Sequence, residues 1–183
     1  QLIGPDAFGS SYGGQSGLSR AKLQAVTRIY TVYQARCRQA NAMDFDDVLV
    51  NTFRLLNENA DIRNKYADRF QYILVDEYQD TNSVQVAIVK LLTVKHQRVC
   101  VVGDDYQSIY SFRGANIDNI LDYQKKFDNV QVFKLERNYR STQKIVEAAN
   151  SLMKHNVKQI PKEVYSKESE GSKIRYHSCY SDK

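Results

Sequence analysis

The stretch YILVDEYQDTN, residues 72–82, places an apolar run directly before three acidic residues. Its first four residues, Tyr72 to Val75, have the length and composition of a short buried strand. Asp76 and Glu77 follow at once, and Asp80 comes three residues later. In open parallel sheets, ligands bind beyond the carboxyl ends of the strands. A strand that ends on this much negative charge therefore predicts a site for a cation or for proton transfer.

Two further apolar runs and two helical patterns follow this stretch. Strands are expected over residues 72–75, 99–102 and 130–135, and helices over residues 84–92 and 117–127. The order strand, helix, strand, helix, strand is typical of a parallel α/β sheet. We therefore predict the α/β class.

The flanking regions have a different character. Residues 1–17 hold five of the eight glycines and are expected to form a loop or linker. Apolar residues at helical spacing predict helices from Ser19 to Cys37, from Asp44 to Leu56 and from Ser141 to His155, with Ser19 and Ser141 as N-caps. The polar tail is expected to form a hairpin around Glu170-Gly171, with residues 173–177 as one strand.

Composition sets broad limits on the class of protein. The formal net charge is +5 with a pI of about 9.0, which permits an anionic partner such as nucleic acid. No run of eighteen apolar residues occurs, so we predict no membrane span. The cysteines, Cys37, Cys100 and Cys179, show no ligand spacing, and this favours a reducing, cytoplasmic setting. Cys100 lies within an apolar run and is expected in the core.

The acidic residues suit a magnesium-dependent phosphate chemistry. Mg²⁺ binds one or two carboxylates together with substrate phosphates, and Asp76 could serve in this way. A second carboxylate, Glu77, could orient or deprotonate a water. Asp104 ends the next apolar run and is expected at the same edge. The alternative is that the acids cap the following helix, whose N-terminus favours negative charge.

Four segments carry a resemblance to a known family. ILVDEYQDTN (73–82) resembles the Walker B segment of UvrD/Rep/PcrA-type superfamily 1 DNA helicases, and VVGDDYQSIYSFRGA (101–115) resembles the third motif of that family. LERNYRST (135–142) resembles its fourth motif, and AMDFDDVL (42–49) resembles a helix just upstream. Their order and spacing also agree with the family, and the similarity covers the chain from about Leu23 onward.

The resemblance implies a RecA-like sheet that binds ATP and Mg²⁺, with specific roles for five residues. Asp76 would bind Mg²⁺, and Glu77 would be the catalytic base. Gln107 would sense the γ-phosphate and couple it to DNA, Tyr139 would stack on adenine, and Arg140 would reach the γ-phosphate from a second motor domain. A positioned arginine of this kind contributes about 10³ to 10⁵ in rate. A surface arginine near a helix N-terminus is the alternative for Arg140, but that is an unfavourable place for a cation.

The resemblance also implies a platform for single-stranded DNA. Tyr110 and Phe112 would stack on bases, Arg113 would contact phosphate or stack, and Phe45 would touch the strand. The family often has tryptophan where Phe112 stands, and the smaller ring predicts a weaker grip. The alternative for each aromatic residue is a place in the core, and for Phe45 the two alternatives remain evenly balanced.

No phosphate-binding loop of the form G-x-x-x-x-G-K-[ST] occurs in the chain. Gly4 to Ser10 and Gly9 to Gln15 have the glycine spacing but lack the lysine, and neither follows a predicted strand. The resemblance places this loop before the segments seen here, and later motifs after Lys183. We therefore expect the chain to be the middle of a helicase and to have little ATPase activity alone.

The resemblance divides the chain into three parts. Residues 1–42 would be a linker and part of a helical inserted subdomain, 43–136 the latter part of the first RecA-like domain, and 137–183 the start of the second. The whole protein would be a 3′–5′ helicase that acts on single-stranded DNA and single/double-strand junctions in repair or replication, with repair or replication proteins as further partners.

Other functions are compatible with parts of the sequence. A truncated relative could hold single-stranded DNA or a protein without hydrolysis. A helicase–nuclease subunit would carry the same motor and a nuclease domain elsewhere. A metal-dependent nuclease built on Asp76, Glu77 and Asp104 would leave Tyr139, Arg140 and the Tyr110–Phe112 pair unexplained.

Overall fold

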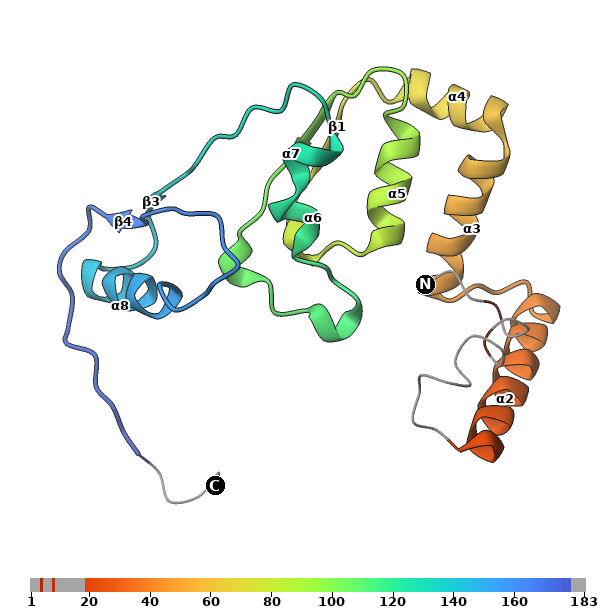
Figure 1. Cartoon of the computed structure of the whole chain (residues 1–183), viewed down its shortest axis with the longest axis horizontal. Helices are drawn as coiled ribbons and strands as arrows, with labels where there is room; N and C mark the ends of the chain where they lie inside the picture. Colours follow the sequence, from red (N-terminus) through yellow and green to blue (C-terminus); the bar gives the residue numbers. More distant parts are fainter. Residues whose placement is uncertain (1–3, 5–7, 9–18, 179–183) are drawn as a thin grey trace.

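The structure is a computed structural model that describes Gly4, Phe8 and residues 19–178, and it combines helices with two small parallel sheets (Figure 1). The strands are β1 (Ile73–Val75), β2 (Val99–Val101), β3 (Arg137–Asn138) and β4 (Tyr165–Ser166). The α-helices are α2 (Arg20–Gln39), α3 (Phe45–Glu58), α4 (Ala60–Arg69), α5 (Ser83–Leu92), α6 (Asp118–Leu121), α7 (Tyr123–Lys126) and α8 (Gln143–Met153). The short 3-10 helices are η1 (Tyr78–Asp80), η2 (Asp105–Gln107) and η3 (Ser111–Arg113). This mixed content agrees with the predicted α/β class.

The long helices begin where their capping residues predict. The Ser19 hydroxyl accepts a hydrogen bond from the backbone N–H of Lys22 at the start of α2, as expected. Asp44 caps α3 in the same way. Helix α8 starts after Thr142 instead of Ser141, and Thr142 makes no side-chain cap hydrogen bond. The prediction of Ser141 as the N-cap was therefore wrong by one residue.

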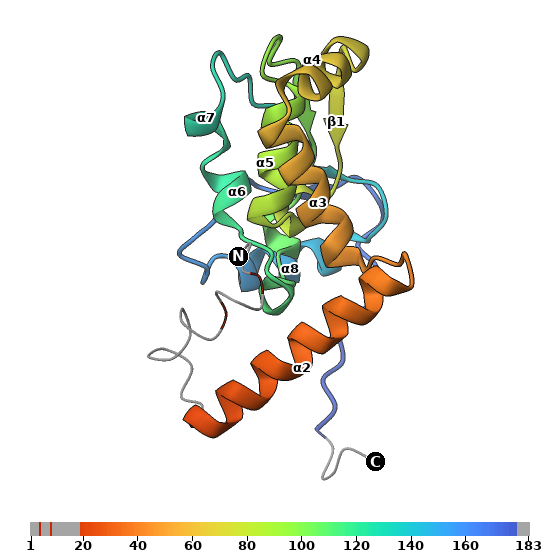
Figure 2. The same ribbon diagram turned by 90° about the vertical axis from the view of Figure 1, so that its right-hand side faces the viewer.

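Strands β1 and β2 form a parallel pair against which α5 packs, with α3 beside α5 and α4 against both helices (Figures 1 and 2). Ile73 pairs with Val99, and Val75 pairs with Val101. The three helices contribute the buried residues Leu56, Ala67 and Val86 to this packing. This packing fixes the carboxyl ends of both strands at one edge.

Several predicted elements differ from the structure. Residues 130–135 form no strand, and Phe133 and Leu135 are 81% and 88% exposed. Because a strand needs a hydrogen-bonded neighbour, an apolar run without one remains a loop. The predicted hairpin strand at residues 173–177 is also absent. The expected helix over 117–127 is divided into α6 and α7, and α4 was not predicted.

The prediction that Cys100 lies in the core was wrong, because Cys100 is exposed. It pairs in register with Leu74, which is 75% exposed. Neighbouring residues in register on parallel strands point to the same face, so this face of the β1–β2 pair is open in the described part of the chain. The apolar composition of residues 99–102 indicated a strand buried on both faces, whereas α5 covers only one face of the β1–β2 pair.

The C-terminal part consists of β3, β4 and α8, and the segment that follows α8 contacts η2 (Figure 1). Strands β3 and β4 form a second parallel pair, and α8 packs against β4. The linker expected at residues 1–17 lies outside the described residues except for Gly4 and Phe8. No helix in the described ranges is long and apolar enough to cross a membrane.

Candidate nucleotide and nucleic-acid site

Two acidic residues follow β1 and remain open to solvent. Asp76 and Glu77 are both exposed. The Glu77 backbone N–H donates to Asp76 Oδ1 at 2.9 Å, and the next backbone N–H, of Tyr78, donates to the Val102 carbonyl at 3.0 Å. No lysine, arginine or histidine of the described residues forms an ion pair with Asp76 or Glu77. Within the described part of the chain, the negative charge at this strand end is therefore left uncompensated.

Glu77 has an unusual backbone conformation. Its φ and ψ angles are 49° and 42°, in the left-handed region that L-residues other than glycine, asparagine and aspartate rarely adopt. Such a conformation persists only where the surrounding structure holds it, and it is found most often at functional sites. This geometry favours a functional reading of Glu77 over a purely structural one.

Gln79 connects the ends of β1 and β2. Its side-chain Nε2 donates to Glu77 Oε2 at 2.7 Å, and its Oε1 accepts the backbone N–H of Asp104 at 3.0 Å. Gln79 is 1% exposed, so its amide has little freedom to reorient. Glycine is required at position 103, because a Cβ there would lie 2.7 Å from Gln79 Oε1. The buried amide thus fixes one carboxylate oxygen of Glu77.

The helix-capping alternative for the two acids was wrong. Helix α5 is capped by Asn82, whose Oδ1 accepts from the backbone N–H groups of Val84 and Gln85. The Gln85 side chain accepts the backbone N–H of Asn82 in return, which completes a capping box. Glu77 precedes η1 without a side-chain cap hydrogen bond. The helix therefore does not need Asp76 or Glu77.

The acids at the end of β2 are compensated, in contrast. Lys162 Nζ lies 2.6 Å from Asp104 Oδ1 and 2.6 Å from Asp105 Oδ1. Asp104 Oδ2 accepts from Gln107 Nε2 at 2.8 Å. Partial burial raises the pKa of Asp104, but the hydrogen bonds from Lys162 and Gln107 outweigh it and lower the pKa overall.

A metal ion would need oxygen ligands besides those of the chain. The residues that the structure describes include no group of three or more His, Cys, Asp or Glu side chains able to hold a metal. The exposed carboxylate of Asp76 suits a hard cation that also binds phosphate oxygens. Asp104 is occupied by Lys162 and Gln107, so a nuclease built on Asp76, Glu77 and Asp104 finds no support in this geometry.

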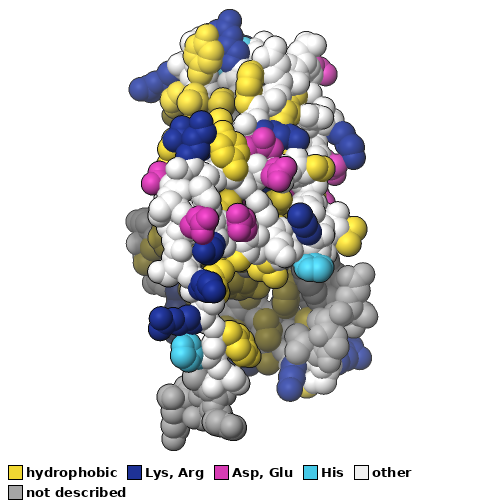
Figure 3. All heavy atoms as spheres, turned by 90° about the vertical axis from the view of Figure 1, so that its left-hand side faces the viewer, with side chains coloured by type: hydrophobic (Ala, Val, Ile, Leu, Met, Phe, Trp, Pro, Cys, Tyr) yellow, Lys and Arg dark blue, Asp and Glu magenta, His cyan; other side chains and the backbone are white. Residues whose placement is uncertain are grey.

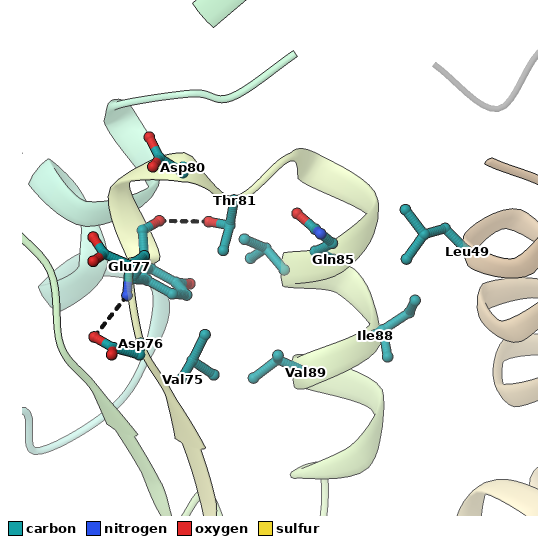
Figure 4. A pocket seen from close by; sticks show the side chains of 11 residues that line it. Leu49, Val75, Asp76, Glu77, Asp80, Thr81, Gln85, Ile88 and Val89 are labelled. Atoms are coloured by element: carbon teal, nitrogen blue, oxygen red, sulfur yellow. Dashed lines mark hydrogen bonds between the residues drawn. The ribbon is translucent and has the colours of Figure 1, made fainter. Parts of the chain in front are cut away.

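A pocket beside β1 is bordered by both apolar and acidic residues. This space of about 420 Å³ lies between β1, η1, α3 and α5. Val75, Ile88 and Val89 line it on one side, and Asp76 and Glu77 are also among its lining residues. In Figure 4 the carboxylates of Asp76 and Glu77 point away from α5, so the acids border the pocket at the side opposite that helix.

Tyr110, Phe112 and Arg113 form a compact exposed cluster. The ring centroids of Tyr110 and Phe112 lie 6.0 Å apart with an interplanar angle of 40°. The Arg113 guanidinium carbon lies 5.3 Å from the Tyr110 centroid and 5.4 Å from that of Phe112. Phe112 is 76% exposed, which excludes it from the core. These three side chains form one exposed surface, which we call the aromatic cluster, and its role as a platform for DNA stays a prediction.

Phe45 is also exposed, with 92% of its surface open. It is the first residue of α3, and Asp44 caps that helix before it. The core alternative for Phe45 was therefore wrong. An exposed phenylalanine at a helix start presents an aromatic surface for a ligand, as the DNA-contact prediction requires.

Tyr139 and Arg140 follow β3, away from β1 in Figure 1. Tyr139 is 72% exposed, and the Arg137 guanidinium carbon lies 4.4 Å from its ring centroid. Asn138 Oδ1 accepts the backbone N–H groups of Arg140 and Ser141, which sets the turn into α8. Within the described ranges, the Arg140 side chain forms no ion pair. The structure does not bring Tyr139 and Arg140 together with Asp76 and Glu77.

The net positive charge is not concentrated on the face toward β3, β4 and α8. In Figure 3, lysine and arginine side chains are interspersed with acidic ones, and apolar side chains line a hollow below. Charge alone therefore does not mark a nucleic-acid surface on this face, and the aromatic cluster is the stronger indication.

Comparison with known proteins decides the family. Residues 11–128 match the model of the UvrD/REP helicase N-terminal domain, and residues 133–183 match that of the UvrD-like helicase C-terminal domain. This chain belongs to the UvrD/REP helicase family. The family resemblance inferred from the four segments is thereby confirmed.

Similar proteins are named ATP-dependent DNA helicase PcrA. The protein from Bacillus subtilis is 41% identical over 177 residues, which are 97% of this chain and 23% of the relative. The protein from Leuconostoc citreum is 41% identical over 159 residues, 87% of this chain and 21% of the relative. The protein from Staphylococcus aureus (strain COL) is 42% identical over 160 residues, which are 87% of this chain and 22% of the relative. The chain spans about one fifth of the length of these relatives.

Sequence reasoning missed three residues that the structure places at the acidic ends of β1 and β2. Gln79 stands inside the quoted acidic segment, and a buried polar residue between two acids could have drawn notice. Gly103 precedes Asp104 and could have signalled a close backbone approach. Lys162 lies in a polar tail, 58 residues from Asp104, and carries no local signal.

Proposed function

We propose that this chain is the central part of an ATP-dependent DNA helicase that moves 3′ to 5′ along single-stranded DNA. Family membership and the names of the relatives support the proposal. One geometric observation carries it: buried Gln79 links Glu77, the proposed base, to the turn that holds Gln107. A single hydrogen-bonded network thereby joins two residues to which the proposal gives roles at the γ-phosphate.

The proposed chemistry is hydrolysis of ATP at the carboxyl ends of β1 and β2. The open carboxylate of Asp76 fits Mg²⁺, which when bound would neutralise developing phosphate charge. Glu77 would accept a proton from water, and the Gln79 hydrogen bond to Oε2 would leave Oε1 for that purpose. Gln107 would present its side-chain amide to the γ-phosphate.

Residues after β3 would complete the site from a second domain. In this proposal residues 43–136 belong to a first RecA-like domain, 137–183 begin a second one, and 1–42 belong to a helical insertion. Tyr139 would stack on adenine, and Arg140 would stabilise the transferring phosphate. The exposed ring of Tyr139 and the guanidinium of Arg140, which forms no ion pair with the described residues, are compatible with these roles.

The aromatic cluster and Phe45 would hold single-stranded DNA or a single/double-strand junction. Base stacking contributes about 1 to 3 kcal/mol per base and tolerates any sequence, as a translocating enzyme requires. Arg113 would add a phosphate contact or a stacking surface. We place the whole protein in the cytoplasm, in repair or replication, where proteins of those processes would be its partners.

The experiment that tests this function is ATP hydrolysis with and without single-stranded DNA. It compares these 183 residues with the whole protein, meaning the longer protein of which we propose they are a part. We expect DNA-stimulated hydrolysis by the whole protein. We expect little by the 183 residues, because no G-x-x-x-x-G-K-[ST] sequence occurs in them. A whole protein that binds DNA yet hydrolyses no ATP would contradict the proposal and establish a binding module instead.

A further inference from the structure

A lysine from the segment after α8 lies between the two carboxylates at the end of β2. Lys162 Nζ is 2.6 Å from an oxygen of Asp104 and 2.6 Å from an oxygen of Asp105. The Lys162 side chain is 15% exposed, and that of Asp105 is 2% exposed. By contrast, the Lys158–Asp118 pair of the same segment spans 3.3 Å, with side chains 69% and 45% exposed. Lys162 therefore occupies a built site.

Further contacts fix the lysine and its backbone. Lys162 Nζ lies 3.9 Å from the Tyr106 ring centroid, and the Tyr106 hydroxyl donates to the Lys162 carbonyl at 3.4 Å. The backbone N–H of Ile160 donates to Asp105 Oδ2 at 2.7 Å. These contacts attach residues 160–162 to η2. They join two parts of the chain that are more than 50 residues apart in sequence.

The two carboxylates have different second partners. Asp105 uses its other oxygen to anchor the Ile160 backbone. Asp104 uses its other oxygen to accept the side-chain amide of Gln107 at 2.8 Å. The Asp105 contacts alone would hold the segment in place. The additional contact from Lys162 reaches Asp104 Oδ1, which also accepts the backbone N–H of Tyr106 at 3.1 Å, on the carboxylate whose other oxygen holds Gln107.

We propose that Lys162 is a positioning residue that fixes the Asp104 carboxylate and, through it, the side-chain amide of Gln107. The segment after α8 would thereby set the glutamine that faces the nucleotide. This inference rests on the proposed function, because it takes the γ-phosphate role of Gln107 from it. The role of Lys162 itself comes from the contacts described above.

The charge state of the cluster suits this role. Burial lowers the pKa of Lys162, but its hydrogen bonds to Asp104 and Asp105 outweigh that effect and raise the pKa overall. The pKa of Asp104 is lowered in turn. Both groups are therefore charged at neutral pH, and a charge-assisted hydrogen bond fixes orientation better than a neutral one.

The first test measures the Gln107 side-chain amide in these 183 residues by ¹⁵N NMR. Lys162→Met removes the ammonium, and Lys162→Arg keeps the charge. Lys158→Met is the matched control from the same segment. We expect Lys162→Met to move the Gln107 Nε2 resonances toward those of a free glutamine, whereas Lys162→Arg and Lys158→Met leave them near the wild-type positions.

A second variant keeps the test decisive if Lys162→Met does not fold. Asp104→Asn keeps the Lys162–Asp105 pair and the Ile160 anchor, so it leaves the segment attached. It removes the charged acceptor of Gln107, and we expect the same shift of the Gln107 resonances. Unchanged Gln107 resonances in folded Lys162→Met or Asp104→Asn would overturn the proposal.

The second test separates positioning from structural support in the whole protein. We expect Lys162→Met to lower kcat of DNA-stimulated ATP hydrolysis by about tenfold or more, because small misplacements of a catalytic group cost up to about 100-fold. The KM for ATP should change less than twofold, and Lys162→Arg should restore most of kcat. An unchanged kcat for Lys162→Met would overturn the positioning role. If wild-type whole protein hydrolyses no ATP, the proposed function fails, while the Gln107 resonances still decide whether Lys162 orients this amide.

Discussion

The ends of β1 and β2 carry the same kind of residue in opposite electrostatic settings. Both strands stop at paired acids, Asp76-Glu77 and Asp104-Asp105, along one edge of a parallel pair. Lys162 compensates the second pair, whereas no basic residue of the described chain compensates the first. One lysine offsets half of the charge of the β2 pair, whereas the β1 pair has no basic partner among the described residues, which is compatible with a ligand at the β1 pair. In the proposed function the β1 acids serve catalysis, whereas the β2 acids attach the segment after α8 and, through Asp104, hold Gln107.

The largest expected effect comes from the β1 pair. In the whole protein, Glu77→Gln should lower kcat for DNA-stimulated ATP hydrolysis by about 10²- to 10⁴-fold, the range typical of a general base. Glutamine keeps an oxygen to accept the Gln79 hydrogen bond, so single-stranded DNA affinity should stay within about twofold. Steady-state hydrolysis and fluorescence anisotropy measure the two quantities. A loss of less than tenfold in kcat would remove Glu77 from the catalytic role.

The β2 pair should respond through stability. Asp105→Asn leaves the buried Lys162 ammonium with one carboxylate partner fewer, and breaking a buried pair costs about 3 to 5 kcal/mol. Because Asp104 remains, we expect the free energy of unfolding of these 183 residues to fall by about 3 kcal/mol. Urea unfolding measures it.

The control for this prediction is Lys158→Met, which removes an exposed pair and should cost about 0.5 kcal/mol or less. Equal losses for Asp105→Asn and Lys158→Met would show that the β2 acids are not structural, and the contrast between the two strand ends would disappear.

The aromatic cluster should account for a smaller effect on DNA affinity. Phe112→Ala removes a ring that is 76% exposed and stands 6.0 Å from Tyr110. Loss of one stacked base corresponds to about 1 to 3 kcal/mol, or about 5- to 150-fold in Kd. Phe133→Ala, which removes another exposed ring outside the cluster, should change Kd less than twofold. Equal effects would show that exposed aromatic area, and not the cluster, binds DNA.

Local signals in the sequence predicted much of the described structure. Ser19 and Asp44 marked helix starts because a cap depends on residues only three positions apart. Asp76 and Glu77 were placed at a strand end because the apolar run stops at them. The grouping of Tyr110, Phe112 and Arg113 was implied by the family resemblance, and the structure places Arg113 over both rings.

The features that failed depend on distant partners. Residues 130–135 have a strand-like composition, but a strand needs a neighbour, and the sequence does not show whether one is present. Cys100 is exposed because its face of the β1–β2 pair is open in the described part of the chain, and a local sequence pattern does not show which face of a sheet is covered. Lys162 is separated from Asp104 by 58 positions, so no local pattern could join them. The position of Tyr139 and Arg140 relative to Asp76 likewise depends on how the part with β3 and α8 meets the part with β1 and β2, and no local pattern shows that.

One measurement tests the contrast between the two strand ends most directly. It is the free energy of unfolding of these 183 residues when Asp76→Asn and Glu77→Gln are combined in one variant. Both substitutions preserve shape and hydrogen-bond acceptors while removing the charges. Because no basic side chain of the described residues pairs with those charges, we predict that the free energy of unfolding in urea stays within about 0.5 kcal/mol of wild type or rises. A fall of about 2 kcal/mol or more would show that the β1 acids support the fold, and would contradict their reservation for a ligand.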